Sequence, residues 1–474
     1  MTGKEKLILL VVMLGVLMTA IDSTVVLLAL PTMVSSLHSN IATMIWVIVA
    51  YILAISIFTT QFGKVGDIFG RGRMFNIGFA IFTIGSFLCG AAISDTFLIG
   101  ARVLQAIGAA FLQANSTVII ADTFPPEKRG KAFGYTLVGW NAGALLGIII
   151  GGIVTTYIGW QYIFYINIPI GIAAVAIGAK VLIDNKRFKH QIDFPGMVLL
   201  GLTLFALTYS GLDFAINGPS AYNISALVAS LLLIIIFIIV EKRSRNPTIV
   251  FAAFKNRTLT ASTLAAFFQS MAMIGAMFMI IIYLQGIRGL SPLVASLYLA
   301  PGYIIGSLFG PRIGDLADKM GPRLIATLGL AFICLALLIY STVSLTTNLY
   351  VISVAALFMG LGGAMFFPAN NKAITSSTSR ENYGSVTGFV RTLGNIGLLL
   401  SYVISLSVAS IAISRAQALQ IFVGTQTVVG GVAAEFVGGV HLAVVVSLIL
   451  AIIAAVLSAM RGKVELVPSV SAQS

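Results

Sequence analysis

Fourteen long apolar runs are the feature that most restricts how this chain can fold. Each run has about 18 residues or more, enough for an α-helix to cross the ~30 Å hydrocarbon core of a bilayer. Backbone polar groups in lipid must bond within their own segment, so runs of this length predict helices. We expect spans at about 7–30, 43–62, 74–93, 98–121, 132–156, 164–183, 195–217, 223–241, 259–285, 292–313, 323–343, 348–371, 384–411 and 438–460.

The composition agrees with a protein surrounded by lipid. Of 474 residues, 58% are hydrophobic and 9% are charged, against about a quarter charged in soluble domains. The net charge of +13 does not indicate nucleic-acid binding, because the basic residues are spread over short loops instead of one face. Cys89 and Cys334 lack a CxxC partner and the three histidines lack ligand spacing, so we expect neither a disulfide nor a metal.

Lysine and arginine are concentrated on one side of the predicted membrane. With a cytoplasmic N-terminus, the basic residues fall in cytoplasmic loops or at cytoplasmic helix ends except for Arg102, Arg288, Arg391 and Arg415. This bias is typical of cytoplasmic loops. We therefore expect a multi-pass protein of the cell membrane with both termini in the cytoplasm.

Two segments recur at nearly one offset. GAAFLQANSTVI (108–119) matches GAMFFPANNKAI (363–374) at six positions, and GKVGDIFG (63–70) shares G-x-x-x-D-x-x-G with GDLADKMG (314–321). The repetition indicates duplicated halves, an architecture that transporters use. We expect an all-α polytopic membrane protein with an N-terminal six-helix bundle (1–183), two inserted helices with flanking loops (184–258), a C-terminal six-helix bundle (259–460) and a cytoplasmic tail (461–474).

Several motifs resemble those of the major facilitator superfamily. GKVGDIFGRGR (63–73) resembles its loop between helices 2 and 3, RVLQAIGAA (102–110) its fourth-helix motif, and GWNAGALLGIIIGG (139–152) its fifth-helix antiporter motif with Ile148 in place of proline. IDSTVVLLALP (21–31) and WQYIFYINIPIG (160–171) are similar to the fourteen-span drug:proton antiporter branch. The resemblance covers essentially the whole chain and implies transport by alternating access with protons as the coupling ion.

The loop motif predicts a conformational latch. Its glycines permit tight turns, and Asp67 can cap a helix or pair with an arginine across the bundle interface. An ion pair that exists in one conformation only biases a rocking motion. The predicted latch residues are Gly63, Asp67, Gly70, Arg71, Arg73 and, in the second half, Asp318. For Lys64 and Arg71 a solvated cytoplasmic loop is an equally good interpretation.

The fifth span carries a glycine ridge. Gly139, Gly143, Gly147 and Gly151 recur every four residues, followed by Gly152. Such a ridge lets another helix pack closely. Plain packing and a role in helix sliding explain it equally well.

A carboxylate and an arginine inside apolar runs predict the proton site. Asp22 shares a helix face with Thr19 and Ser23, and Arg102 begins a polar stripe on span 4 that continues through Gln105 and Gln113. Because span 4 enters from the outer side, Asp22 and Arg102 are expected at similar depth, where burial opposes ionisation of the acid and the arginine favours it. A permanent structural ion pair is the alternative.

The remaining expectations concern the cargo. Arg102 aligns with Leu357, which suggests proton handling in the first half and mostly neutral contacts in the second, and Glu435 and His441 lie where they could gate the outer side. We expect a monomer that exports neutral or monocationic lipophilic compounds and uses no cofactor besides protons. Alternatives are a nutrient or metabolite symporter, an exporter of a lipid or natural product, and a non-transporting sensor; an intramembrane enzyme is disfavoured because H-E-x-x-H is absent. Candidate cavity residues are Trp46, Tyr51, Gln105, Gln113, Asn115, Trp140, Gln269, Phe278, Tyr283, Phe366, Asn370 and Asn371.

Overall fold

The structure is a computed structural model that describes residues 2–182, 192–244, 253–379, 382–412 and 432–462. These residues form helices and no strand. Fourteen of the described segments are long and apolar enough to cross a membrane, which confirms the predicted number of spans and the all-α fold.

The first six spans form the N-terminal bundle. The sixth span is interrupted, because Pro169 cannot donate a backbone hydrogen bond and disfavours a helical residue before it. The spans are α1 (Gly3–Ser36), α2 (Ile41–Phe69), α3 (Arg71–Gly90), α4 (Asp95–Thr123), α5 (Pro126–Tyr157) and the pair α6 (Tyr162–Tyr165) and α7 (Asn167–Val181).

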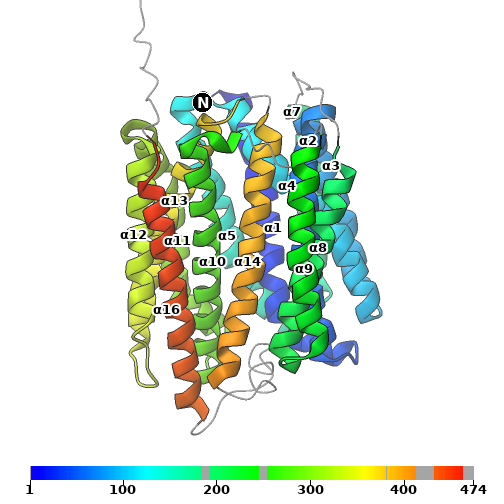
Figure 1. Ribbon diagram of the computed structural model, residues 1–474, viewed down its shortest axis with the longest axis vertical. Coiled ribbons are helices and arrows are strands. Elements are labelled where there is room, and N and C mark those ends of the chain that lie inside the picture. The colour runs from blue at the N-terminus through cyan, green and yellow to red at the C-terminus, as the bar shows by residue number, and fades with distance from the viewer. Residues whose placement is uncertain (1, 183–191, 245–252, 380–381, 413–431, 463–474) are drawn as a thin grey trace, which may run out of the picture.

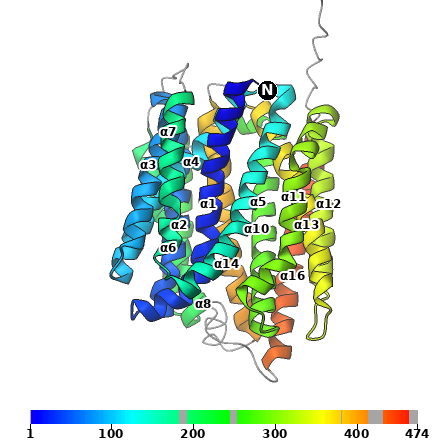
Figure 2. The ribbon, with the colours of Figure 1, turned by 180° about the vertical axis from the view of Figure 1, so that it is seen from behind.

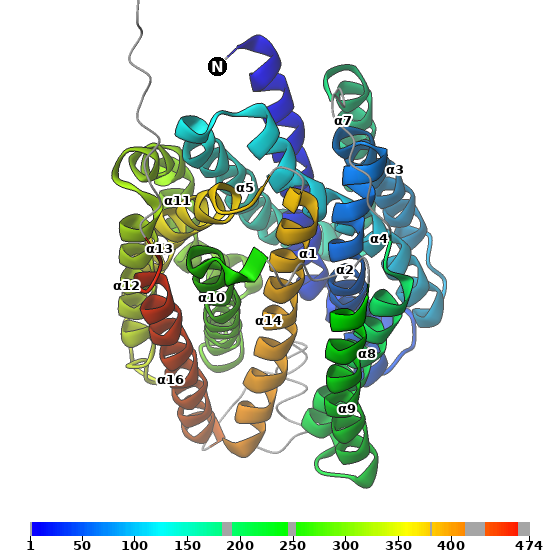
Figure 3. The ribbon, with the colours of Figure 1, turned by 45° about the horizontal axis from the view of Figure 1, so that its top comes forward.

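The last six spans form the C-terminal bundle, and two further helices lie between the bundles in sequence. The inserted helices α8 (Phe194–Asn217) and α9 (Ala221–Arg243) pack against each other at one side of the molecule, where α8 contacts α2 and α14 (Figures 1 and 3). The C-terminal bundle contains η1 (Ala253–Lys255), α10 (Arg257–Ile282), η2 (Tyr283–Ile287), α11 (Pro292–Met320), α12 (Pro322–Tyr340), α13 (Leu349–Ser376), α14 (Tyr383–Ala412) and α16 (Val432–Ala459).

Local sequence signals explain where the helices begin and turn. The side chains of Asn40, Ser94 and Ser291 accept hydrogen bonds from the first backbone N–H groups of α2, α4 and α11, and so act as N-caps. Gly70 (φ 108°) and Gly321 (φ 89°) turn the chain from α2 into α3 and from α11 into α12. Both residues close the repeated G-x-x-x-D-x-x-G segment, so the repeat encodes the same positive-φ turn twice.

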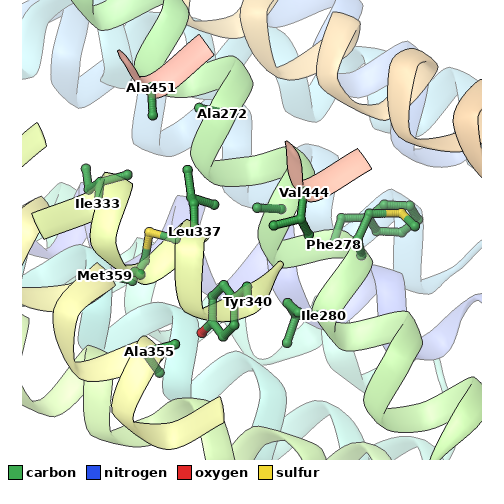
Figure 4. Close-up of a cluster of buried hydrophobic side chains, with 14 of the residues drawn as sticks. Ala272, Phe278, Ile280, Ile333, Leu337, Tyr340, Ala355, Met359, Val444 and Ala451 are labelled. Carbon is green, nitrogen blue, oxygen red and sulfur yellow. The ribbon is translucent and has the colours of Figure 1, made fainter. Parts of the chain in front are cut away.

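The interior of the C-terminal bundle is a continuous apolar cluster. Side chains from α10, α12, α13 and α16 meet there, including Ile333, Leu337 and Met359 (Figure 4). The N-terminal bundle has its own cluster, in which Phe75 and Phe79 of α3 contact edge to face. The C-terminal cluster also reaches the other bundle, because Ile45 of α2 belongs to it.

The two bundles are joined at one end of the molecule. This end, called here the basic end, is where α1 begins and where the α2–α3, α4–α5 and α11–α12 turns lie, and α5 packs beside α11 (Figure 2). The hydrogen bonds described between the bundles cluster in this half: Thr60 with Thr392, Arg129 with Tyr383, Gly130 and Lys131 with Asp318, Thr117 with Arg391, and Gln113 with Asn395.

Candidate functional site

Asp22 and Arg102 form an ion pair inside the N-terminal bundle. Arg102 Nη1 lies 2.6 Å from Asp22 Oδ2, and the side chains are 1% and 0% exposed, respectively. Gln105 Nε2 donates to the other carboxylate oxygen at 2.8 Å, while its Oε1 accepts from Arg102 at 2.6 Å. Both oxygens of Asp22 therefore accept hydrogen bonds, so this conformation matches the charged form of the acid.

Further contacts hold the arginine in place. Arg102 Nε donates to the Val47 carbonyl at 3.1 Å, and its guanidinium carbon lies 3.9 Å from the centre of the Tyr51 ring. Tyr51 and Gln105, both predicted for the substrate cavity, thus belong to this buried cluster. Thr19 and Ser23, which share a face with Asp22, instead donate to backbone carbonyls of their own helix.

The C-terminal part of the polar stripe on α4 contacts the other bundle. Gln113 Oε1 accepts from Asn395 Nδ2 at 3.2 Å, and Thr117 Oγ1 accepts from Arg391 Nη2 at 3.1 Å. Arg391 lies about 12 Å along α14 from Tyr383 at the basic end, at 1.5 Å per residue. One face of α4 thus serves the buried ion pair in its N-terminal half and the bundle interface in its C-terminal half.

Asp318 connects the two bundles at the basic end. Its carboxylate accepts from the backbone N–H groups of Gly130 at 3.0 Å and Lys131 at 3.1 Å, at the beginning of α5. Lys372 of its own bundle lies 2.8 Å away. A carboxylate at a helix N-terminus is favoured by unpaired N–H groups and by the helix dipole, and here the helix belongs to the opposite bundle.

Asp67 occupies the equivalent place in the first half. It accepts from Arg71 Nε at 2.7 Å, and Arg71 also pairs with Asp122. The Arg71 guanidinium carbon lies 6.0 Å from the ring centre of Tyr383, the first residue of α14. The predicted latch residues Asp67, Arg71 and Asp318 therefore lie at the bundle interface, whereas Arg73 has an exposed side chain.

Glycines bring the bundle backbones together. A Cβ added to Gly63 of α2 would overlap the carbonyl oxygen of Gly384 in α14, and one added to Gly130 of α5 would overlap that of Gly314 in α11. These two pairs are related by the internal repeat. Side chains larger than hydrogen would separate the bundles at both places.

The glycine ridge of α5 packs on α1, the helix that carries Asp22. A Cβ on Gly143 would lie 2.5 Å from the Leu17 carbonyl oxygen, and one on Gly147 would meet Thr24 and Ile21. Gly139 contacts the backbone of Met13 in the same way. A Cβ at Gly152 would meet nothing within 4 Å, so the tight ridge ends before that residue.

Several predicted cavity residues lie inside a bundle instead. Asn115 donates to the Phe111 carbonyl and packs on Gly66, Tyr283 donates to the Ser344 carbonyl, and Asn370 accepts from Arg461. Phe366 is part of the C-terminal apolar cluster. Asn115, Tyr283, Phe366 and Asn370 were not placed correctly from the sequence, because an apolar helix does not reveal which of its faces meets protein and which meets lipid. Trp46 of α2 differs, because it is only partly buried and packs both on Phe205 of the inserted helix α8 and on the C-terminal cluster.

Other predicted cavity residues keep positions that suit a cavity. Trp140 is 39% exposed, so its ring is not enclosed by either bundle. Gln269 donates to the Met273 sulfur. Phe278, by contrast, is a buried member of the same C-terminal cluster as Phe366, with its ring edge to face with that of Tyr402 and the ring centres 5.4 Å apart. Asn371 is 7% exposed, and its Nδ2 has no hydrogen-bond partner.

The sequence prediction missed some interface residues and leaves others outside the described part. Lys372, Asp122 and Tyr383 contact the latch and were not identified, although the repeat that aligns Gly130 with Gly384 could have pointed to α14. A ring nitrogen of His441 contacts the Val343 carbonyl, while the side chain of Glu435 lies outside the described residues.

Two packed six-helix bundles, with a charged pair buried in one and polar groups between them, are the architecture of a membrane transporter. The family model of the Major Facilitator Superfamily matches residues 12–402, and the chain belongs to this superfamily. It is a transporter and not an enzyme.

Curated relatives cover most of the chain. It is 32% identical over 407 residues to the riboflavin transporter RibZ of Clostridioides difficile (strain 630), covering 84% of this chain and 87% of that protein. It is 31% identical over 403 residues to the multidrug transporter protein MdtP of Bacillus subtilis (strain 168), covering 83% and 73%, respectively. The solved structure of the proton:xylose symporter XylE shares the fold, with a TM-score of 0.62, 14% identity, and 94% and 95% of the two chains covered.

Proposed function

We propose that this protein is a proton-coupled exporter of small lipophilic compounds in the cell membrane, with both termini in the cytoplasm. The observation that carries the proposal is the Asp22–Arg102 pair, a carboxylate and an arginine held in contact where neither side chain reaches solvent. Charged side chains within a span are costly and are typical of proton relays. The basic end of the molecule is then its cytoplasmic end.

A proton on Asp22 changes the balance of this cluster. Protonation removes the charge that holds Arg102, and one carboxyl oxygen becomes a donor that faces the amide of Gln105. The pair separates, and α1 shifts relative to α4. Release of the proton restores the pair, so the transport cycle alternates between a bonded and an open arrangement.

The basic end provides the second element of the cycle. Asp318 and Arg71, which is paired with Asp67, hold the bundles together there and stabilise the conformation described here. Opening towards the cytoplasm breaks both sets of contacts and separates the glycine pairs. The conformation seen here is the one closed at the cytoplasmic end.

Reconstituted vesicles test the proton coupling. Efflux of a fluorescent lipophilic dye is measured with and without an imposed pH gradient, for the wild type, Asp22→Asn and the control Asp213→Asn. Asp213 is a partly exposed carboxylate on the inserted helix α8, where it accepts from Asn217 and Asn223. We expect the gradient to drive transport by the wild type and the control but not by Asp22→Asn; efflux that ignores the gradient would falsify the proposal.

Uptake or exchange of a small metabolite is a second candidate. The similarity to a riboflavin transporter favours it, since that relative and this chain share most of their lengths. The two candidates differ in the direction of counterflow. In vesicles, a symporter accumulates its cargo on the side towards which protons flow, whereas an antiporter accumulates it on the side from which they come.

A further inference from the structure

Arg391 differs from the other arginine within a span in having no acidic partner. Arg102 is bound to Asp22, as a permanently charged group in a membrane requires. Arg391 is only partly buried, and within the described part of the chain its contacts are Thr117 Oγ1 at 3.1 Å and the ring of Phe367 at 5.2 Å. Among the residues that the structure describes, no acid is therefore paired with its positive charge.

Arg391 lies between the two bundles, where transporters built from two repeats bind their cargo. Thr117 belongs to the N-terminal bundle and Phe367 to the C-terminal bundle, so the guanidinium lies between the two. The next residue of α14, Thr392, bonds to Thr60 of the N-terminal bundle at 2.7 Å. Arg391 thus lies at the interface between the bundles.

The groups around Arg391 are neutral donors and aromatic rings. Asn395, one turn further along α14, bonds to Gln113 of the opposite bundle. Asn371 lies one turn from Phe367 on α13, and its Nδ2 is buried without an acceptor. A guanidinium has five N–H donors, and four of those of Arg391 have no acceptor among the described residues. Arg391 and Asn371 therefore offer a positive charge and N–H donors that have no acceptor among the described residues.

The same face of α14 becomes aromatic further from the basic end. Arg391, Asn395, Leu398 and Tyr402 follow one another at helical spacing, and the Tyr402 ring packs on Phe278 of α10. The distance along the helix from Arg391 to Tyr402 is about 16 Å at 1.5 Å per residue. This length suits an elongated compound with a charged group at one end.

We propose that the cargo is an amphipathic organic anion whose carboxylate or phenolate binds Arg391 and the Asn371 amide, with its aromatic body lying towards Tyr402. This inference rests on the proposed export function and replaces the neutral or monocationic cargo expected from the sequence. An anion takes up the free guanidinium donors with charge-assisted hydrogen bonds. A cation at the same place meets an uncompensated positive charge in a medium of low dielectric constant.

Equilibrium binding to the purified full-length protein in lipid nanodiscs tests the charge preference. The probes are two dyes with a common xanthene core, the anion fluorescein and the cation rhodamine 123, followed by fluorescence anisotropy at one pH without a gradient. The wild type is expected to bind fluorescein at least about tenfold more tightly. Equal affinities, or tighter binding of rhodamine 123, overturn the inference without any variant being needed.

Variants assign the preference to Arg391. We expect Arg391→Gln to weaken fluorescein binding about 10- to 100-fold and leave rhodamine 123 binding unchanged or improved, in line with the loss of a hydrogen bond to a charged group. Arg391→Lys should keep part of the affinity, because it keeps the charge but not the planar fork. The control Arg323→Gln removes an exposed arginine at the basic end and should change neither affinity.

The outcome is separable from that of the export proposal. Unchanged fluorescein affinity in a folded Arg391→Gln protein, as judged by its melting temperature and elution volume, contradicts the binding role. A protein that prefers fluorescein but ignores a pH gradient contradicts proton coupling alone. A protein that couples to protons but prefers rhodamine 123 contradicts the anionic cargo alone.

Discussion

Gly130 of α5 and Gly314 of α11 lie backbone to backbone across the bundle interface, and a Cβ added to either would overlap the carbonyl oxygen of the other. The repeat places Gly63 and Gly384 in the same relationship on the other side. The closed basic end is therefore built from two backbone contacts that tolerate no side chain, supported by the Asp318 carboxylate near the beginning of α5 in the opposite bundle.

Gly314→Ala is expected to shift the protein towards the conformation that is open at the basic end. The added methyl group cannot be accommodated without separating α5 from α11. Spin labels at positions 69 and 320, two exposed sites on α2 and α11, should show a longer distance by double electron–electron resonance. Gly363→Ala is the control, because its Cβ meets nothing within 4 Å; equal distances in the two variants would contradict the contact.

Asp318→Asn should weaken the same closure by removing charge. The neutral amide cannot pair with Lys372 and is a poorer partner for the α5 N–H groups. We expect the open population to increase about tenfold, which corresponds to ~1.4 kcal/mol. Asp315→Asn on the same helix breaks only an exposed pair with Lys319 and should leave the distance distribution unchanged.

Removing one member of the buried pair is expected to destabilise the protein more than removing both. Asp22→Asn leaves the Arg102 charge buried without its counter-ion, a loss of about 3–5 kcal/mol in comparable cases. In the double variant Asp22→Asn/Arg102→Gln no buried charge remains, so part of the loss should be recovered. Thermal unfolding in detergent is measured for the wild type, Asp22→Asn, Arg102→Gln and the double variant, which form a double-mutant cycle. Strictly additive losses of stability would show that the two side chains do not interact.

Gly143→Ala is expected to disturb the packing of α1 on α5. Its Cβ would lie 2.5 Å from the Leu17 carbonyl oxygen and 2.8 Å from the Ala20 Cβ, and overpacking of this kind costs typically ~1–3 kcal/mol. Gly152→Ala on the same helix meets no atom within 4 Å. A melting temperature lower in the first variant than in the second would support the ridge; the reverse order would contradict it.

Features that depend on the contrast between polar and apolar residues could be predicted from the sequence. A charge within an apolar run has few possible partners, so Asp22 and Arg102 could be matched from their depth alone, and the repeated glycines gave the turns at Gly70 and Gly321. Span number followed from hydropathy because a helix is the only solution for a long apolar run in lipid.

The orientation of aromatic and amide side chains could not be predicted in the same way. Phe366 and Tyr283 lie within the C-terminal bundle, although nothing in their local sequence separates them from cavity residues. In lipid, the outside of a bundle is as apolar as its inside, so periodicity no longer marks the buried face. Arg391 was noted in span 13, but only its three-dimensional surroundings show that no acid of the described residues contacts it.

Helix α4 holds Arg102 and Gln105 at one level and Gln113 and Thr117 at another, and between them Gly108 presses against the backbone of α3. Both levels belong to one continuous helix. Any shift of α4 at the acid therefore also moves the residues that contact α14, and no relay of side chains between the two levels is required.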